Sequence, residues 1–259
     1  MGTSIARVGS ELDGAVLTLT LENPSRANAL TDRMLEDLAA AAAEPPPGTR
    51  AILLRGTGSR HFSSGVDLGG DPTPARLRES EGRLRSAVEA LRESPVPVIA
   101  ALNGSAYGGA LEVAMACDWR VAARGIEVAM PPGRLGVVYS LRGLRLFVAA
   151  IGPARTAELF LTGTPMDAER ALAIGLVNAL FAPDELLPRA REAARRVAAA
   201  APIAVQGTVA LIRALGQAPV SEGVHESAEA WRARAYASAD LAEGLAAFRE
   251  RRAPRFTGA

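Results

Sequence analysis

The sequence contains no lysine, one cysteine and two histidines in 259 residues. Without lysine, the chain can form neither a Schiff base with a carbonyl substrate nor the internal linkage of pyridoxal phosphate, and it has no phosphate-loop lysine. A single cysteine, Cys117, excludes an internal disulfide and a zinc site built from several cysteines. The histidines, His61 and His225, leave little for histidine-rich metal chemistry, so we expect no metal and no redox cofactor.

The sequence also lacks an excess of charge of either sign. Its 29 basic residues, all arginine, stand against 28 acidic residues and leave a net charge of +1. Nucleic-acid binding would require a basic excess. No apolar run reaches the roughly 18 residues of a membrane span, and Arg7, Glu11 and Asp13 precede any long apolar run, unlike a signal peptide. We therefore expect a soluble cytoplasmic protein that binds neither nucleic acid nor membrane.

Hydrophobic periodicity predicts strands alternating with helices up to about residue 181, and helices alone from about residue 184. The expected strands are 14–21, 51–55, 96–102, 118–123 and 176–181. The expected helices are 32–43, 75–93, 108–117, 141–151, 154–162 and 167–174. Alternation of this kind is typical of an α/β core, which we place at residues 1–199, followed by a helical C-terminal region at residues 200–259.

Local residue chemistry predicts where several helices begin and end. Thr31 can cap the helix that follows it, because its hydroxyl can accept a backbone N–H of the first turn. Asp240 and Glu243 have the spacing of a capping box, which predicts that the last helix begins there. The expected C-terminal stops of three central helices are Gly152, Gly163 and Gly175.

Three segments could carry chemistry, and the first is residues 61–68. Its strand end leads into small residues and Gly65. Such a turn leaves backbone N–H groups unpaired and lets a ligand approach closely. An ordinary β-turn is the alternative interpretation.

The second segment, residues 103–112, leads from a buried strand into a helix that begins at Gly108 and Gly109. The first N–H groups of a helix have no internal partner, and the helix dipole favours negative charge there. Glu112 lies one turn after Gly109 among apolar residues, where an acid costs free energy unless it is paired or functional. A Glu112–Arg pair that holds the core is the structural alternative.

The third segment, residues 130–140, contains two prolines and two glycines, which fix a rigid loop. Tyr139 offers a hydroxyl on an otherwise apolar stretch. Buried tyrosines usually bind a backbone partner, so a purely structural role for Tyr139 stays open.

These segments, together with residues 24–30 and 240–248, resemble the crotonase (enoyl-CoA hydratase/isomerase) superfamily, in the same order and over nearly the whole chain. The resemblance implies a spiral of ββα units with a helical C-terminal trimerisation region. It also implies an acyl-CoA thioester as the substrate, no cofactor other than the coenzyme A that this substrate carries, and a homotrimer or a dimer of trimers.

The resemblance further assigns roles to individual residues. The backbone N–H groups of Val66 and Gly109 would form an oxyanion hole for the thioester oxygen, and Glu112 would be the first acid. Arg26 is the candidate contact for a coenzyme A phosphate, and Arg252 or Phe256 of a neighbouring subunit is a weaker one. Coenzyme A is expected to thread between residues 26–29 and 64–68. The expected substrate-binding and coenzyme-A-binding residues are Arg26, Ala27, Ala29, Ser64, Asp67, Leu68, Gly108, Pro132 and Leu135.

Within the superfamily, the chain is most similar to the methylmalonyl-CoA decarboxylase branch, in which the tyrosine that matches Tyr139 contacts the substrate. Pro132 stands where a hydratase carries its second glutamate, and it cannot exchange protons. Loss of CO₂ needs no general base, so decarboxylation suits these residues. One member of this branch carries a histidine at the position of Val66, so the site is expected to be more apolar in this chain. We expect Tyr139 to hold the substrate carboxylate, and Glu112 to be protonated or turned toward an arginine.

Three hypotheses about function follow. The first is a lyase that decarboxylates a methylmalonyl-CoA-like substrate. The second is a hydratase, isomerase or hydrolase of the same superfamily, in which Glu112 acts with a water. The third is a non-catalytic trimer that binds acyl-CoA.

Overall fold

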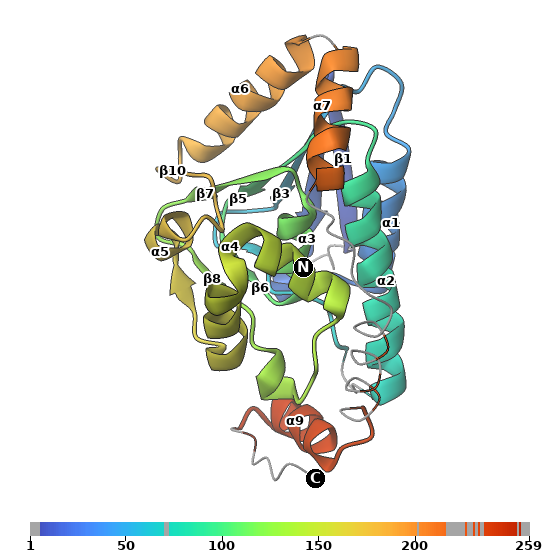
Figure 1. Ribbon diagram of the computed structural model, residues 1–259, viewed down its shortest axis with the longest axis vertical. Helices are drawn as coiled ribbons and strands as arrows, with labels where there is room; N and C mark the ends of the chain where they lie inside the picture. The colour runs from blue at the N-terminus through green and yellow to red at the C-terminus, as the bar shows by residue number, and fades with distance from the viewer. Residues whose placement is uncertain are drawn as a thin grey trace.

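The computed structural model describes residues 6–69, 73–200, 202–215 and 236–252, together with residues 226, 230, 233 and 254. His225 and Phe256, which the sequence analysis singled out, lie outside these residues. Figure 1 shows a layered α/β molecule, with helices packed around the strands.

The larger sheet has six strands in the order β1-β2-β3-β5-β7-β10. These strands are β1 (Arg7–Asp13), β2 (Val16–Glu22), β3 (Ala51–Gly56), β5 (Val98–Leu102), β7 (Trp119–Ala123) and β10 (Ala179–Phe181). Only the β1–β2 pair is antiparallel, and the other neighbours run parallel. Every residue of β5 is buried, as expected for a central parallel strand that is covered on both faces.

A second sheet contains the strands that follow β3, β5 and β7 along the chain, together with one later strand. Its strands are β4 (His61–Ser63), β6 (Ser105–Tyr107), β8 (Glu127–Ala129) and β9 (Met166–Asp167). β3, β5 and β7 of the large sheet are each followed by a strand of the small sheet and then by a helix. These helices are α2 (Pro74–Glu93), α3 (Gly109–Ala116) and α4 (Leu141–Thr162). The predicted spiral of ββα units is therefore confirmed.

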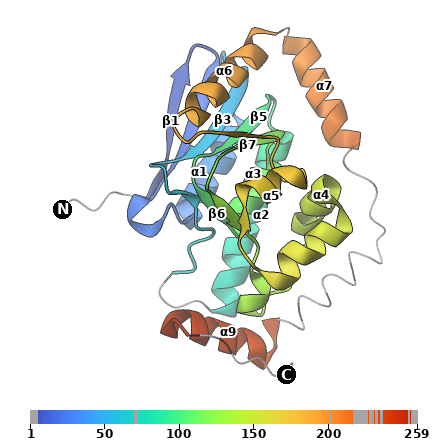
Figure 2. The same cartoon turned by 90° about the vertical axis from the view of Figure 1, so that its left-hand side faces the viewer.

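The remaining helices enclose these sheets. They are α1 (Asp32–Ala43), α5 (Ala168–Ala173), α6 (Leu186–Ala199), α7 (Pro202–Leu215) and α9 (Ala239–Glu250), with short 3₁₀ helices η1 (Pro24–Arg26) and η2 (Pro132–Leu135). α6 lies against β3, β5 and β7 of the large sheet. Figure 2 shows α7 and α9 at opposite ends of the molecule. Among the described residues, no helix has the length and apolar character that a membrane crossing requires.

Several predicted helix ends are confirmed. The Thr31 hydroxyl accepts the Met34 N–H at 3.2 Å and caps α1. Gly152, Gly163 and Gly175 have φ angles of 76°, 57° and 83°, positive values that glycine adopts readily and that interrupt a helical segment. The break at Gly152 lies between the two helical segments of α4.

Three expectations about elements are wrong. The cap of α9 is Ser238, whose hydroxyl accepts the Leu241 N–H at 3.1 Å, whereas Glu243 pairs with Arg252 at 2.6 Å. β1 was not expected, because it is an exposed edge strand without a buried stripe. The last strand begins at Ala179 and not at 176, since Leu176 and Val177 pack into the core ahead of the sheet.

Cys117, at the end of α3, is buried, and the reactivity of its thiol provides a test of that burial. Burial, with a smaller effect from the Asp118 charge, raises the pKa of its thiol to about 12. We expect iodoacetamide at pH 8 to label Cys117 only as fast as the protein unfolds, because an unfolded cysteine ionises near pH ~8.5. The stability that this shift contributes is complete below pH ~8.5 and declines as the pH rises toward 12. Equal labelling rates for the folded and the urea-unfolded chain would contradict this burial.

Candidate active site

One pocket of about 1230 Å³ opens between α2, α3 and η2. Twelve of the thirteen predicted site residues line this pocket: Arg26, Ala29, Ser64, Val66, Asp67, Leu68, Gly108, Gly109, Glu112, Pro132, Leu135 and Tyr139. Ala27 does not line it. Its carbonyl accepts the Ser64 N–H at 3.0 Å, so Ala27 supports the wall from behind.

The first wall is a short parallel pairing of residues 27–30 with residues 64–67. Leu30 donates its N–H to the Gly65 carbonyl at 2.8 Å, and Asp67 donates its N–H to the Leu30 carbonyl at 2.8 Å. In a parallel pairing, a residue exchanges backbone hydrogen bonds with the two neighbours of its partner residue and not with the partner itself. Val66, the partner of Leu30, therefore turns its own N–H away from Leu30. The two segments between which coenzyme A is expected to thread are thus hydrogen-bonded to each other along this stretch.

The second wall is the start of α3. Gly108 has φ 55° and ψ −128°, a conformation that a residue with a side chain rarely adopts. It places Gly109 at the first helical position, where the N–H has no partner within the helix. Among the described residues, neither the Val66 N–H nor the Gly109 N–H donates a hydrogen bond to another group of the chain.

The two walls touch at positions where only glycine fits. A Cβ on Gly109 would lie 2.8 Å from a methyl of the Val66 side chain. A Cβ on Gly65, whose φ is +102°, would lie 2.8 Å from the Tyr107 carbonyl and 3.6 Å from the Gly109 nitrogen. The two predicted oxyanion donors are thus neighbours on the lining of one pocket.

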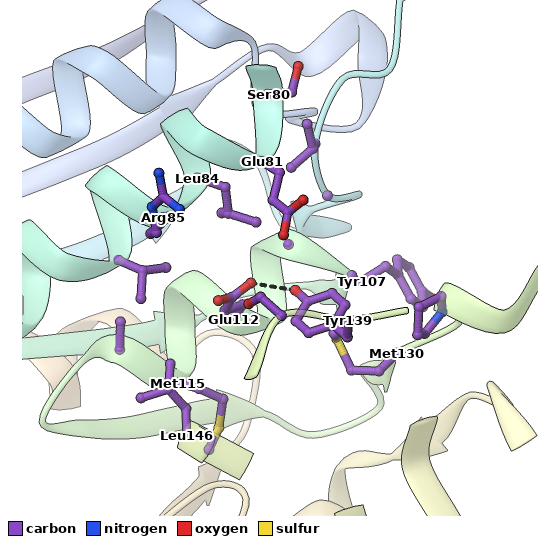
Figure 3. Close-up of a pocket in the computed structure, with 18 of the residues that line it drawn as sticks. Ser80, Glu81, Leu84, Arg85, Tyr107, Glu112, Met115, Met130, Tyr139 and Leu146 are labelled. Carbon is purple, nitrogen blue, oxygen red and sulfur yellow. Dashed lines mark hydrogen bonds between the residues drawn. The ribbon is translucent and has the colours of Figure 1, made fainter. Parts of the chain in front are cut away.

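Glu112 and Tyr139 meet beside these amides. The Tyr139 hydroxyl donates a short hydrogen bond to Glu112 Oε2 (Figure 3). Glu112 is 4% exposed, and the Tyr139 ring packs edge-on against Phe160 with centroids 5.3 Å apart. The Tyr139 hydroxyl therefore binds a carboxylate and not the backbone partner that a purely structural role predicts.

The environment of Tyr139 keeps its hydroxyl protonated. Burial contributes most to raising the pKa of Tyr139 well above its usual value, and the charge of Glu112 and the hydrogen bond to it raise it further. Tyr139 is consequently a neutral hydrogen-bond donor at physiological pH.

The predicted phosphate contacts already have partners within the chain. Arg26 forms an ion pair with Asp67 at 3.1 Å, and its side chain is 55% exposed. Arg252 forms ion pairs with Glu243 and Glu250 at 2.6 Å and 2.5 Å. Arg26 lines the pocket and Arg252 does not, so Arg26 is the better placed of the two.

Glu81 on α2 is a site residue that the sequence analysis missed. It lines the pocket, and Figure 3 shows its carboxylate extending from α2 toward the Glu112–Tyr139 pair. It accepts the Tyr236 hydroxyl at 2.6 Å, and its charge contributes to raising the pKa of Tyr139. A signal was available, because Glu81 falls between Leu77 and Leu84 on the apolar stripe of its helix.

The described residues contain no group of three or more histidine, cysteine, aspartate or glutamate side chains that could hold a metal ion. The residues in the pocket offer hydrogen bonding by two amides and a tyrosine, and proton exchange by two carboxylates.

Comparison with known proteins gives consistent matches. A profile of the family described as enoyl-CoA hydratase/isomerase matches residues 11–259. The (E)-benzylidenesuccinyl-CoA hydratase of Thauera aromatica is 33% identical over 253 residues, 96% of this chain and 98% of the relative. Methylmalonyl-CoA decarboxylase of Escherichia coli (strain K12) is 34% identical over 235 residues, 89% of this chain and 90% of the relative. A solved structure of methylmalonyl-CoA decarboxylase complexed with 2S-carboxypropyl-CoA matches with a TM-score of 0.91 at 31% identity, over 99% of this chain and 100% of that one.

Gly143, in the first turn of α4, tests the packing of the Glu112–Tyr139 pair. A Cβ there would lie 2.6 Å from Tyr139 Cε1 and 2.7 Å from Glu112 Oε1. We expect Gly143→Ala to lower the free energy of unfolding by about 1–3 kcal/mol, because overpacking displaces both side chains. The matched control is Gly82→Ala, which enters open space on α2 and should raise stability by about 0.5–1 kcal/mol. Urea unfolding measures both changes, and equal stability of the two variants would contradict the packing.

Proposed function

Because the chain belongs to the enoyl-CoA hydratase/isomerase family, we propose that it binds an acyl-CoA thioester with the carbonyl oxygen between the N–H groups of Val66 and Gly109. The observation that carries this proposal is that both amides lack an acceptor within the described chain and lie beside Glu112 and Tyr139. No cofactor is needed beyond the coenzyme A of the substrate.

The two amides act on the charge that develops in the reaction. When the α-carbon loses a substituent, negative charge moves onto the thioester oxygen. Fixed N–H donors in a site shielded from water stabilise that charge. Removal of one such donor raises the activation free energy by about 3 kcal/mol. The positive end of the α3 dipole at Gly109 acts in the same direction.

Decarboxylation of a methylmalonyl-CoA-like substrate is the reaction that we favour. The bond between the α-carbon and the carboxylate breaks, CO₂ leaves, and the electron pair moves into the enolate held by the two amides. A proton from the site then binds the α-carbon and gives the shortened acyl-CoA, and solvent returns one proton to the site. The similarity to methylmalonyl-CoA decarboxylase supports this reaction, as does Pro132, which cannot act as an acid.

Glu112 would supply that proton, and Tyr139 would position the substrate carboxylate. A substrate carboxylate next to an ionised Glu112 would be repelled, which favours uptake of a proton by Glu112 on binding. The protonated acid can then protonate the enolate carbon. Tyr139, already oriented by Glu112 and Phe160, would donate its hydrogen bond to the substrate carboxylate.

Hydration of an enoyl-CoA is the second candidate, and Glu81 is the observation that favours it. A hydratase needs one group to activate water and another to exchange the α-proton, and Glu81 and Glu112 are two carboxylates in the same pocket. The similarity to (E)-benzylidenesuccinyl-CoA hydratase supports this alternative. The third candidate, a non-catalytic trimer that binds acyl-CoA, applies if neither reaction occurs.

A pair of assays on wild type and on Glu81→Gln separates the two reactions. We expect the wild type to release CO₂ from methylmalonyl-CoA and not to hydrate crotonyl-CoA, followed at the enone absorbance. Glu81→Gln should retain CO₂ release within about threefold, because no proton transfer in decarboxylation uses Glu81, whereas Glu112→Gln should lose at least about 10²-fold. Hydration by the wild type that Glu81→Gln abolishes would establish the second candidate instead. Binding of both esters without either reaction would support the third.

We also propose that α7 contributes to the subunit interface of a homotrimer. This trimer would exist either alone or as one half of a dimer of trimers. Its Ile203 and Leu211 side chains are 86% and 66% exposed, an arrangement typical of a face that another subunit covers. We expect the double substitution Ile203→Glu and Leu211→Glu to shift the mass measured by light scattering from trimer toward monomer. Leu12→Glu, on the β1 edge and away from α7 (Figure 2), is the matched control and should leave the mass unchanged. A wild-type monomer would refute the proposal.

A further inference from the structure

The pocket continues beyond Glu112 toward the C-terminal ends of α2 and α3. The two helices pack together, and Leu84 on α2 lies 3.0 Å from where a Cβ of Gly109 would be. Arg92 on α2 and Asp118 just after α3 lie at the other end of the pocket. They are close enough for the Asp118 charge to raise the pKa of Arg92. Arg92 lies eight positions after Leu84 on α2, which corresponds to a distance of about 12 Å along the helix axis.

The stretch between the two ends has an apolar wall, although Arg85 and Glu89 of α2 line it as well. Val88, Met115 and Leu146 line the pocket there, and each is buried. In Figure 3, Met115 lies on the far side of Glu112 from Tyr139. A wall of this kind fits methylene groups and offers no hydrogen bond to a polar chain.

The far end of the pocket is basic. It is lined by five arginines, against the three carboxylates of Glu89, Glu93 and Asp118. The arginines are Arg92, Arg120, Arg142, Arg145 and Arg213. We call this set the arginine end.

Carboxylate partners hold Arg213 and Arg142 in place. Arg213 forms a bidentate ion pair with Asp118, at 2.8 Å for each contact, and donates to the Ser94 carbonyl at 2.6 Å. Arg142 pairs with Glu89. These pairs use two of the three carboxylates.

Arg92 is different, because its guanidinium makes no hydrogen bond and no ion pair with any described residue. It is half-buried. Burial, followed by the charges of Arg145 and Arg213, lowers its pKa, and the charges of Asp118 and Glu93 offset only part of this cost. An anion placed beside Arg92 would relieve this cost through charge-assisted hydrogen bonds.

We infer that the arginine end binds an anionic group at the distal end of a long acyl chain, so that among long-chain acyl-CoA thioesters those whose chain ends in a carboxylate bind more tightly than those that end in a methyl group. The inference rests on the proposed function, since the thioester must sit at Val66 and Gly109. A span of about 12 Å corresponds to about ten single bonds in an extended chain, which makes a chain of roughly ten to twelve carbons the best fit.

The test compares pairs of coenzyme A thioesters of equal length, one ending in a methyl group and one in a carboxylate, from four to fourteen carbons. Calorimetry measures Kd for the wild type, for Arg92→Gln and for Arg33→Gln, an exposed arginine on α1 that does not line the pocket. We expect the wild type and Arg33→Gln to bind the carboxylate ester of ten to twelve carbons at least about tenfold more tightly than its methyl counterpart. In Arg92→Gln this preference should fall to about twofold or less, while affinity for the methyl esters stays unchanged.

Two results would overturn the inference. One is equal affinity of the wild type for both members of every pair. The other is a carboxylate preference that Arg92→Gln leaves intact. Failure of the wild type to bind even propionyl-CoA would have a separate meaning, because it would refute the proposed function and the inference with it.

Discussion

The close approach of two glycine-containing turns is the constraint on which the candidate site depends. Gly65 and Gly109 lie where any Cβ would meet the opposite turn, so two chain segments more than forty residues apart can bring their amides to one place. The surrounding ββα repeat holds each turn at the end of a strand of the small sheet, where β4 and β6 pair in parallel. The donors are therefore fixed by the backbone of the fold, and any side chain added at Gly109 would push the two turns apart.

The acid of the site is tolerated because the fold provides it with a specific partner. Burial of an unpaired carboxylate costs several kcal/mol, and Glu112 is on a helix whose residues are all buried. The Tyr139 hydroxyl supplies the hydrogen bond, and Gly143 leaves room for both side chains. The same hydrogen bond that makes this burial possible thus also orients the proton-carrying groups toward the pocket.

The sequence predicted the parts of the site that local chemistry determines. The glycines of residues 61–68 and 103–112 marked turns with free amides, and Thr31 and Gly163 marked helix ends, because each of these signals depends on neighbouring residues. The Glu112–Tyr139 hydrogen bond spans 27 positions, and no local pattern reveals such a contact. Glu81 was missed because the helix over residues 75–93 was predicted from hydrophobic periodicity, which ignores a carboxylate between the apolar positions, and β1 because an exposed edge strand carries little hydrophobic periodicity. The capping residue of α9 was misassigned since Ser238 and Asp240 are both good caps, and only the backbone conformation distinguishes them.

The two favoured reactions place opposite demands on the same carboxylates. Hydration needs Glu81 and Glu112 to differ in protonation, so that one accepts a proton while the other donates one. Decarboxylation brings a third carboxylate, that of the substrate, next to Glu112. Two like charges at 4 Å repel by about 4 kcal/mol at an effective dielectric constant of 20, so a malonyl-type substrate binds well only if the site takes up a proton. Tyr139 remains a neutral donor and can direct a hydrogen bond to whichever carboxylate stays ionised. The two proposed reactions therefore differ in how many carboxylates the pocket must accommodate beside the neutral Tyr139 donor.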